Sequence, residues 1–145
     1  MDSLTIIKKK FMEDNFANHL GIILDEISDD HVKMHMKLKP FMNNFHGMPH
    51  GAAIYGLADA AFSVIGNNNN NKCVALNCDI NYHASPEPGK ILYVKGEKIK
   101  QTKRIGTYIF SLYIINDKKK KRKIATMIST LYCTGKPYDI KKNND

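Results

Sequence analysis

The chain has 145 residues, 43% of them hydrophobic, and a formal net charge of +8. This length suffices for one globular domain with a hydrophobic core and is short for two, so a single domain is expected over residues 1–145. No run reaches the roughly 18 apolar residues of a membrane span, and the N-terminus lacks a signal-peptide pattern, which together favour a cytoplasmic protein.

Three elements are expected before a loop at residues 41–50. The first is an amphipathic helix at 4–16, and two strands follow it at about 21–30 and 31–38. The second strand alternates strictly between apolar and polar residues, which is typical of a half-buried strand. The core-facing side chains of the helix are predicted to be Ile7, Phe11 and Met12.

One long helix is expected at about 49–66. Pro49 suits the first turn of a helix because its missing N–H would be unpaired there, and Gly66 with the asparagine run at 67–71 ends it. The helix carries one acid, Asp59, among small and apolar residues, which predicts a helix buried all round. Burying a lone carboxylate is costly unless it is paired or used, so Asp59 is a candidate functional residue.

Four strands are expected after the asparagine run, which we interpret as a loop insertion. Their predicted spans are about 73–83, 90–102, 105–116 and 123–134. No second helix is available to connect parallel strands, so the four favour an antiparallel meander. The sequence therefore predicts an α+β domain in which one long helix lies against a strongly curved antiparallel sheet.

The basic charge gathers in a lysine-rich block, DKKKKRK at 117–123. The block lies between two alternating apolar runs, which indicates a hairpin tip. Only Arg104 and Arg122 are arginines, whereas base readout favours arginine. We therefore expect a solvated loop and no nucleic-acid partner. An anionic partner is the alternative, and the basic charge would suit a polyphosphate ligand.

Three cysteines, Cys73, Cys78 and Cys133, form an odd set without CxxC spacing. We expect them to be small apolar residues in a reducing compartment, and neither disulfides nor a zinc site. His31 and His35 are expected on the solvent face of a strand, where they do not converge on a four-coordinate metal. The sequence therefore predicts no metal and no bound cofactor.

The residues that open the central helix, NNFHGMPHGAAIYGLAD at 43–59, match a family pattern in which N-P-x-G-x-x-H-G-G precedes small residues ending in L-A-D. The matching positions here are Asn44, Gly47, His50, Gly51, Leu57, Ala58 and Asp59. Phe45 and Ala52 depart from the pattern, in place of a proline and a glycine. With the order of elements, the motif resembles hotdog-fold acyl-CoA thioesterases of the PaaI-like branch of the 4-hydroxybenzoyl-CoA thioesterase superfamily, over about residues 16–134.

Thioester hydrolysis, which the resemblance implies, needs a donor where the oxyanion develops, and the N–H of Gly51 at a helix N-terminus can supply it. Asp59 is the candidate base or nucleophile, although it lies about 12 Å along the helix from Gly51. A base acts within about 3 Å of its proton. An antiparallel second helix solves the problem, so we predict a homodimer with shared sites, which in the family commonly pairs into tetramers. The alternative for Asp59 is a structural carboxylate bonded to loop amides.

The other residues of the motif have further interpretations. Asn44 either donates its amide to the thioester or orients the loop, as asparagine commonly does in turns. His50 is expected to position the loop and not to transfer a proton. Gly47 is expected in the CoA-binding part of the site, and Tyr55 in the acyl pocket.

Relatives often carry Ser or Thr early in the strand after the asparagine loop, where its hydroxyl helps to hold the attacking water; the equivalent residue here is Ala75. Asn77 is expected on the same face and is the candidate substitute. Lys103 and Arg104 lie where relatives carry basic residues near the CoA phosphates. We therefore expect a hydrolase that splits acyl-CoA into free acid and CoA. The alternative is a non-catalytic acyl-CoA-binding or regulatory module.

Overall fold

The computed structural model describes residues 1–137; residues 138–145, the end of the predicted domain, lie outside the described residues. The helices are α1 (Ser3–Met12), α2 (Asn15–Leu20) and α3 (Gly51–Gly66), with a 3-10 turn η1 (Pro40–Met42). The strands are β1 (Ile23–Ile27), β2 (His31–Lys37), β3 (Cys73–Tyr82), β4 (Ile91–Gln101), β5 (Ile105–Ile115) and β6 (Lys121–Cys133). Each predicted strand is present, with bounds shifted by a few residues.

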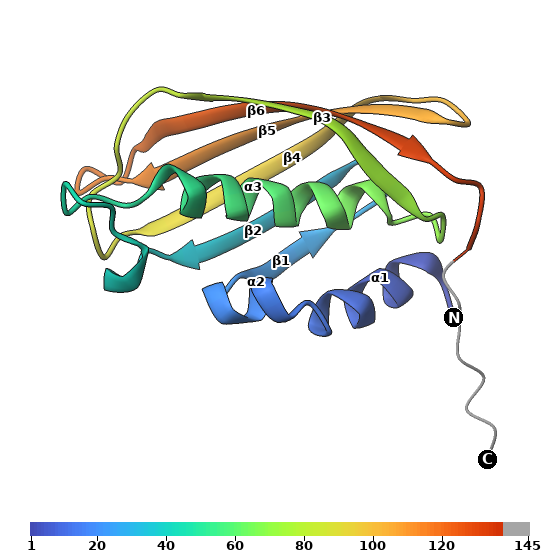
Figure 1. The fold of residues 1–145 in the computed structure, drawn as a ribbon, viewed down its shortest axis with the longest axis horizontal. Helices are drawn as coiled ribbons and strands as arrows, with labels where there is room; N and C mark the ends of the chain where they lie inside the picture. The colour runs from blue at the N-terminus through green and yellow to red at the C-terminus, as the bar shows by residue number, and fades with distance from the viewer. Residues whose placement is uncertain (138–145) are drawn as a thin grey trace, which may run out of the picture.

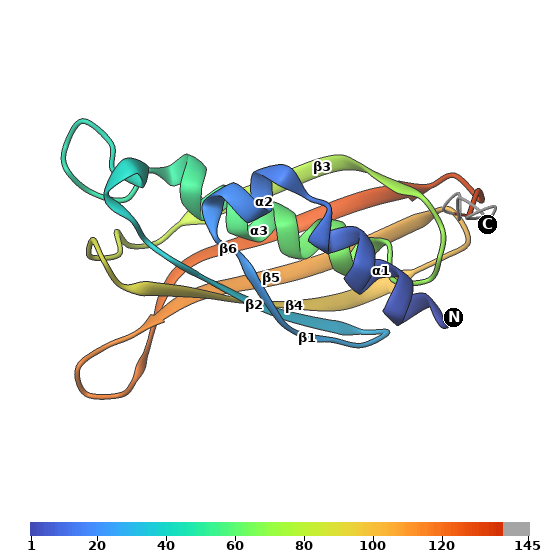
Figure 2. The same cartoon turned by 90° about the horizontal axis from the view of Figure 1, so that it is seen from below.

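The six strands form one antiparallel sheet, and α3 lies along its inner face (Figure 1). Figure 2 shows α1 and α2 lying over α3 on the side away from the sheet. The small residues of α3 let the sheet approach the helix closely, and the hydrophobic core forms between α3 and the sheet. Its fully buried side chains include Met34, Met36, Leu57, Ile65, Phe110, Leu112, Ile124 and Met127. The predicted α+β architecture, one long helix against a curved antiparallel sheet, is confirmed.

The order of the strands corrects the predicted meander. It runs β1-β2-β4-β5-β6-β3, so β3 pairs with β6 and not with β4, which follows it in the chain. The connection from β3 to β4 therefore crosses the sheet. This arrangement leaves β3 at one edge of the sheet, alongside α3.

The N-terminal helix is shorter than predicted, and a second helix follows it. Asp14 ends the continuous helix because its side chain caps α2, accepting the N–H of Ala17 at 2.9 Å. Ile7 and Phe11 are buried, as predicted. Met12 is 73% exposed, so its predicted place in the core is wrong.

The cysteine prediction is also corrected. Cys73 and Cys133 lie opposite each other on β3 and β6 and form a disulfide, with their Cα atoms 4.1 Å apart. They are 60 residues apart in the chain, and the register of the two strands brings them together. Cys78 is free and half-buried.

The lysine-rich block is only in part a hairpin tip. The turn is closed by Asn116, whose Oδ1 accepts the N–H groups of Lys118 and Lys120 at 3.0 Å. Strand β6 begins at Lys121, so the second half of the block belongs to the sheet. Within residues 1–137, no helix combines the length and the hydrophobicity that crossing a bilayer requires.

Candidate active site

The loop before α3 is closed by hydrogen bonds that fix where the helix begins. The N–H of His50 donates to the carbonyl oxygen of Met42 at 2.7 Å, and Asn43 pairs with Pro49. His50 is the N-cap: its Nδ1 accepts the N–H of Ala52 at 2.9 Å. The helix therefore starts two residues later than predicted, because the imidazole takes the capping place. A neutral His50 with Nδ1 as acceptor carries its proton on Nε2, a donor that has no partner among residues 1–137.

Gly51 is the first residue of α3, and its N–H has no hydrogen-bond partner among the described residues. The first N–H groups of a helix lack partners within it and lie at the positive end of its dipole. The carbonyl oxygen of Gly51 accepts a hydrogen bond of 3.1 Å from the Tyr82 hydroxyl, and the Tyr82 ring would lie 3.4 Å from a Cβ at this glycine. Burial raises the pKa of Tyr82. Strand β3 thus supports the start of α3.

A pocket of about 360 Å³ opens between the start of α3 and the chain that follows β3. It is lined by Pro49, Gly51, Ile54, Tyr82, His83, Ala84 and Ser85. Gly51 lines this pocket, so the first turn of α3 borders the space that it encloses.

Asn44 holds the turn of the loop. Its Oδ1 accepts the N–H groups of His46 at 2.9 Å and Met48 at 3.2 Å, and its Nδ2 has no partner within residues 1–137. Gly47 has φ +76°, a left-handed conformation that glycine adopts at little cost. The side-chain oxygen of Asn44 therefore orients the loop, and its amide nitrogen is left to donate to a ligand.

Asp59 lies in the middle of α3 and is half-buried. Burial raises the pKa of its carboxyl, and the nearby Asp14 carboxylate raises it further. Within the described part of the chain, no cation pairs with this carboxyl and no loop amide donates to it. A raised pKa without a compensating cation is typical of a functional carboxyl.

Tyr55 lies one helical turn before Asp59 on the same face of α3. Hydrogen bonding with the Cys78 thiol, then burial, raises the pKa of Tyr55 to about 12, and the negative charge of Asp59 adds to the effect. This face of α3 follows β3, since Tyr82 contacts Gly51 and Cys78 influences the pKa of Tyr55.

A β-bulge at Leu76 decides which side chains of β3 face the helix. The register shifts between Ala75 and Asn77, and beyond the bulge Cys78 pairs with the fully buried Ser129. Asn77 is exposed and lies on the opposite side of the strand. The prediction that Asn77 shares the face of Ala75 is therefore wrong, because a bulge turns over every following side chain. Cys78 takes the inward place instead.

Lys103 and Arg104 lie exposed in the turn between β4 and β5. The Arg104 guanidinium donates to the Tyr132 hydroxyl at 3.1 Å and to the Thr134 carbonyl at 3.3 Å. Figure 1 shows this turn at the opposite end of the molecule from the start of α3. Within one chain, the structure does not bring these cations to Gly51.

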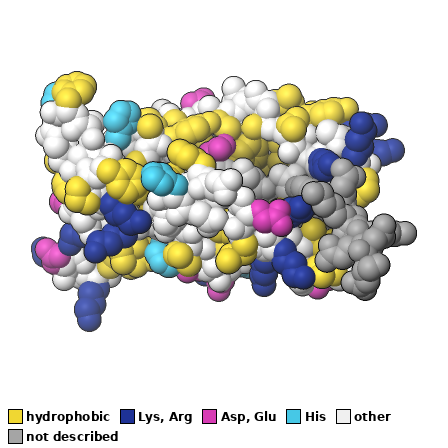
Figure 3. All heavy atoms as spheres, turned by 60° about the horizontal axis from the view of Figure 1, so that its bottom comes forward, with side chains coloured by type: hydrophobic (Ala, Val, Ile, Leu, Met, Phe, Trp, Pro, Cys, Tyr) yellow, Lys and Arg dark blue, Asp and Glu magenta, His cyan; other side chains and the backbone are white. Residues whose placement is uncertain are grey.

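Gly51 and Asp59 are separated by about 12 Å along α3, at about 1.5 Å per residue. One substrate carbonyl therefore cannot reach both groups of the same chain. The adjoining edge strand β3 exposes Val74 and Leu76, 54% and 59% accessible. Hydrophobic side chains are spread over the helical face of the molecule as well (Figure 3). An unpaired edge with exposed apolar side chains is suited to pairing with another chain.

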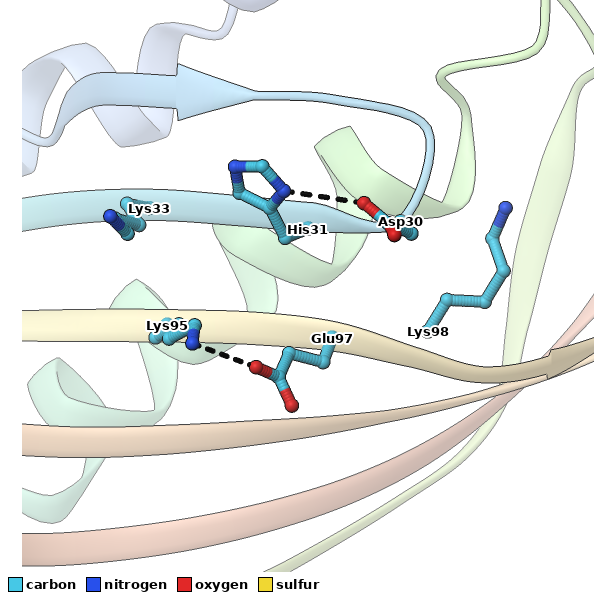
Figure 4. A pocket seen from close by; sticks show the side chains of 6 residues that line it. All are labelled: Asp30, His31, Lys33, Lys95, Glu97 and Lys98. Carbon is cyan, nitrogen blue, oxygen red and sulfur yellow. Dashed lines mark hydrogen bonds and ion pairs between the residues drawn. The ribbon is translucent and has the colours of Figure 1, made fainter.

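A second hollow lies on the outer face of β2 and β4, and two pairs of its lining side chains interact (Figure 4). Lys95 lies 2.8 Å from Glu97, and Asp30 lies 3.3 Å from His31. Lys33 is paired with Glu26 at 2.7 Å. This hollow is a set of exposed ion pairs, and it is far less suited to chemistry than the face of α3.

A family model described as Thioesterase superfamily matches residues 46–119, just over half of the chain. The chain belongs to the thioesterase superfamily. The matched region contains both Gly51 and Asp59. Among curated proteins, no relative matches this chain.

Solved structures share the fold of this thioesterase-superfamily chain. The E. coli PaaI protein from the phenylacetic acid degradation operon is 22% identical, with a TM-score of 0.84 over 93% of this chain and 96% of that one. A hypothetical thioesterase with coenzyme A from Streptococcus pneumoniae TIGR4 is 21% identical, with a TM-score of 0.78 over 89% and 98%. A Streptococcus mutans UA159 protein bound to acetyl CoA is 21% identical, with a TM-score of 0.73 over 80% and 90%. The predicted PaaI-like hotdog fold is confirmed.

Sequence reasoning missed three side chains around this thioesterase-superfamily site: Tyr82, Cys78 and Asp14. Tyr82 lies within the strand predicted at 73–83 and was given no role, and Cys78 was predicted to be a small apolar residue. The sequence does contain a pattern that could have identified Asp14 as a helix N-cap, since an acid before a short helical stretch favours that position. Its nearness to Asp59 depends on how two helices pack and has no signature in the chain.

Proposed function

We propose that this thioesterase-superfamily protein hydrolyses an acyl-CoA to free acid and CoA at two sites shared across a homodimer, without a metal or bound cofactor. One helix face carries the proposal. It presents Gly51 with an unpartnered N–H, and Asp59 with a raised pKa and no cation among the described residues. The coenzyme A and acetyl CoA named for two solved structures of this fold support a CoA-type ligand.

The thioester carbonyl binds in the pocket beside Gly51, whose N–H stabilises the developing oxyanion. Asp59 of the other copy takes a proton from water as the water oxygen bonds to the carbonyl carbon, or Asp59 itself attacks that carbon and forms an anhydride, which water hydrolyses to the free acid once CoA has left. The C–S bond then breaks and CoA leaves as the thiolate, which is a good leaving group because a thiol has a pKa of about 8.5. His50 Nε2 and Asn44 Nδ2 are further donors to the bound thioester.

The dimer forms along the exposed edge of β3, with the two α3 helices antiparallel. A two-fold axis then gives two identical sites, each with Gly51 from one copy and Asp59 from the other. The turn with Lys103 and Arg104 approaches the site that uses Gly51 of the other copy, where cations suit the phosphates of CoA. We expect two such dimers to form a tetramer, as the family resemblance implies.

The first test is thiol release from a panel of short, long and aromatic acyl-CoAs. Asp59→Asn keeps the shape and removes the base, so kcat is expected to fall by about 10²- to 10⁴-fold. Asp29→Asn, an exposed acid in the turn between β1 and β2, is the matched control and should retain full activity. An Asp59→Asn protein as active as the control would contradict the proposed role.

Shared sites are tested by mixing two inactive proteins. Gly51→Pro removes the N–H at a position where helices tolerate proline. When it is refolded together with Asp59→Asn, half of the dimers are mixed and each has one intact site, so activity should return to about a quarter. If mixed dimers form but thioesterase activity does not return, the two groups of each site come from one chain.

A non-catalytic acyl-CoA-binding module is the second candidate. It is favoured by Ala75, which has no hydroxyl where relatives often carry one, and by the outward place of Asn77. Acyl-CoA binding that is unaffected by Asp59→Asn, with no turnover of any thioester in the panel, would identify such a module.

The cytoplasm is the compartment that we propose, and no nucleic-acid partner is expected. The Cys73–Cys133 disulfide stands against that compartment, because disulfides are rare in a reducing cytosol. Mass spectrometry of protein trapped with a thiol alkylator in its own cells would show whether the two cysteines are oxidised there.

A further inference from the structure

Few titratable groups surround Asp59 in the described part of the chain. Tyr55 precedes it by one turn on α3, and the neighbouring Cys78 thiol of β3 is the main cause of its raised pKa. The other group is Asp14, at the start of α2 and outside the region that the family model matches. The Tyr55 hydroxyl and the Cys78 thiol are neutral when protonated. Asp14 is therefore the group that supplies a negative charge near the proposed base.

The packing of α2 on α3 explains how Asp14 comes to this place. A Cβ at Gly56 would lie 3.1 Å from Leu20 Cδ1 and 3.9 Å from Phe16 Cε1, so the glycine allows α2 to lie directly on α3 (Figure 2). Gly56 and Asp59 are three residues apart and therefore neighbours on one helix face. Asp14 precedes Phe16 by two residues. The start of α2 thus reaches the face that carries Asp59.

The carboxylate of Asp14 is held in place by its own helix. Its Oδ1 accepts the N–H of Ala17 at 2.9 Å, which fixes the carboxylate at the start of α2. Asp14 and Asp59 therefore form a pair of carboxylates in different settings, one bonded to a helix end and one without a donor. A fixed negative charge disfavours ionisation of the carboxyl that it faces.

We propose that Asp14 is a positioning residue of the hydrolysis, a second carboxylate that opposes negative charge on Asp59 and so strengthens Asp59 as a base. The proposal rests on the proposed function above. A carboxylate that binds its proton more tightly removes a proton from water more readily, whereas it is ionised over a narrower pH range. Asp14 therefore increases the rate near neutral pH and decreases it in acid.

Asp14→Asn tests this, because asparagine caps a helix as well as aspartate does and carries no charge. Glu13→Gln is the matched control, since Glu13 is the adjacent exposed acid and pairs with Lys10 at 3.2 Å. Two quantities are measured in full-length protein: kcat/KM against pH, and the titration midpoint of the Asp59 carboxyl by carbon-13 NMR. In Asp14→Asn, the acid limb and the midpoint should both move to lower pH, and the plateau should fall. Glu13→Gln should change neither.

The decisive quantity is the ratio of kcat/KM of Asp14→Asn to that of the wild type, measured against pH. If Asp14 acts through Asp59, this ratio rises as the pH falls, which loss of structure cannot produce. An unchanged Asp59 midpoint would overturn the proposal, whether or not activity is lost. Asp14→Ser, which also caps, replaces the asparagine variant if that one fails to fold. A wild type without turnover would refute the proposed function, whereas the NMR midpoint would still decide whether the two carboxyls are coupled.

Discussion

Tyr82 and His50 hold opposite ends of a single peptide group, the one between Gly51 and Ala52. The Tyr82 hydroxyl donates to the carbonyl oxygen of Gly51 at 3.1 Å, and His50 Nδ1 accepts the N–H of Ala52 at 2.9 Å. The peptide is thus fixed from β3 on one side and from the loop on the other. The adjoining N–H of Gly51, which we assign to the oxyanion, is oriented by the same two contacts.

Tyr82→Phe should therefore weaken catalysis while the fold persists. The variant loses one hydrogen bond, worth about 1 kcal/mol, so kcat/KM should fall about 5- to 10-fold and stability by about 1 kcal/mol. Tyr93→Phe is the control, because Tyr93 lies on the outer face, stacked on Tyr113. Steady-state kinetics and thermal unfolding of both variants check this. Equal losses of activity in the two would contradict the role of the Tyr82 hydroxyl.

Asp59→Asn should stabilise the protein in a pH-dependent way. The folded-state pKa of Asp59 is raised above its ordinary value of 3.8, so the folded protein binds this proton more tightly than the unfolded chain does. Ionisation of Asp59 therefore opposes folding, and this cost is present above the folded-state pKa and vanishes below 3.8. The variant should melt above the wild type at pH 7, with a difference that shrinks as the pH falls. Melting curves from pH 7 to 3 measure it, and a lower Tm of the variant at pH 7 would disagree.

The disulfide should carry a large part of the stability. It closes a loop of 60 residues, for which the loss of chain entropy corresponds to about 4 kcal/mol. Replacing Cys73 and Cys133 together with serine should lower the free energy of unfolding by about 2 to 4 kcal/mol in chemical denaturation. The unfolded wild type should show one reactive thiol without reductant, that of Cys78. Three reactive thiols without reductant would show that the bond is absent.

A charge on the exposed edge of β3 should separate the copies. Leu76 is 59% exposed there, so Leu76→Lys costs little within one chain but places an ammonium group against the other strand of the proposed dimer. Ile99→Lys is the control, since Ile99 is 56% exposed on β4, away from that edge. Light scattering should give a monomer without thioesterase activity for the first variant and an unchanged assembly for the second. If the Leu76→Lys variant is still a dimer, the interface does not lie along the edge of β3.

Local patterns account for the elements that the sequence predicted correctly. The strict alternation of β2 and the small apolar residues of α3 are repeated signals over many residues, so both elements were found. The motif around Asn44, His50, Gly51 and Asp59 was also visible, because its residues lie within 16 positions of one another.

The parts that were missed depend on contacts between distant residues. The pairing of β3 with β6, and the disulfide that it permits, follow from the order of strands in the whole sheet. The bulge at Leu76 is a matter of register, which alternation alone does not fix, so Asn77 was assigned to the wrong face. Asp14 is near enough to raise the pKa of Asp59 because α2 packs on α3 at Gly56.

The asparagine run illustrates a different consequence of such contacts. Asn68 is 1% exposed and donates to the Ser28 carbonyl at 2.6 Å, and Asn67 accepts the N–H of Cys73 at 2.8 Å. Asn71 accepts the N–H of Gly135 at 3.0 Å. The asparagines of the run therefore make different hydrogen bonds, and the length of the run fixes where β3 begins. A gene that gained or lost one asparagine codon here would misplace β3, and with it the disulfide and the edge of the proposed dimer, although the composition would hardly change.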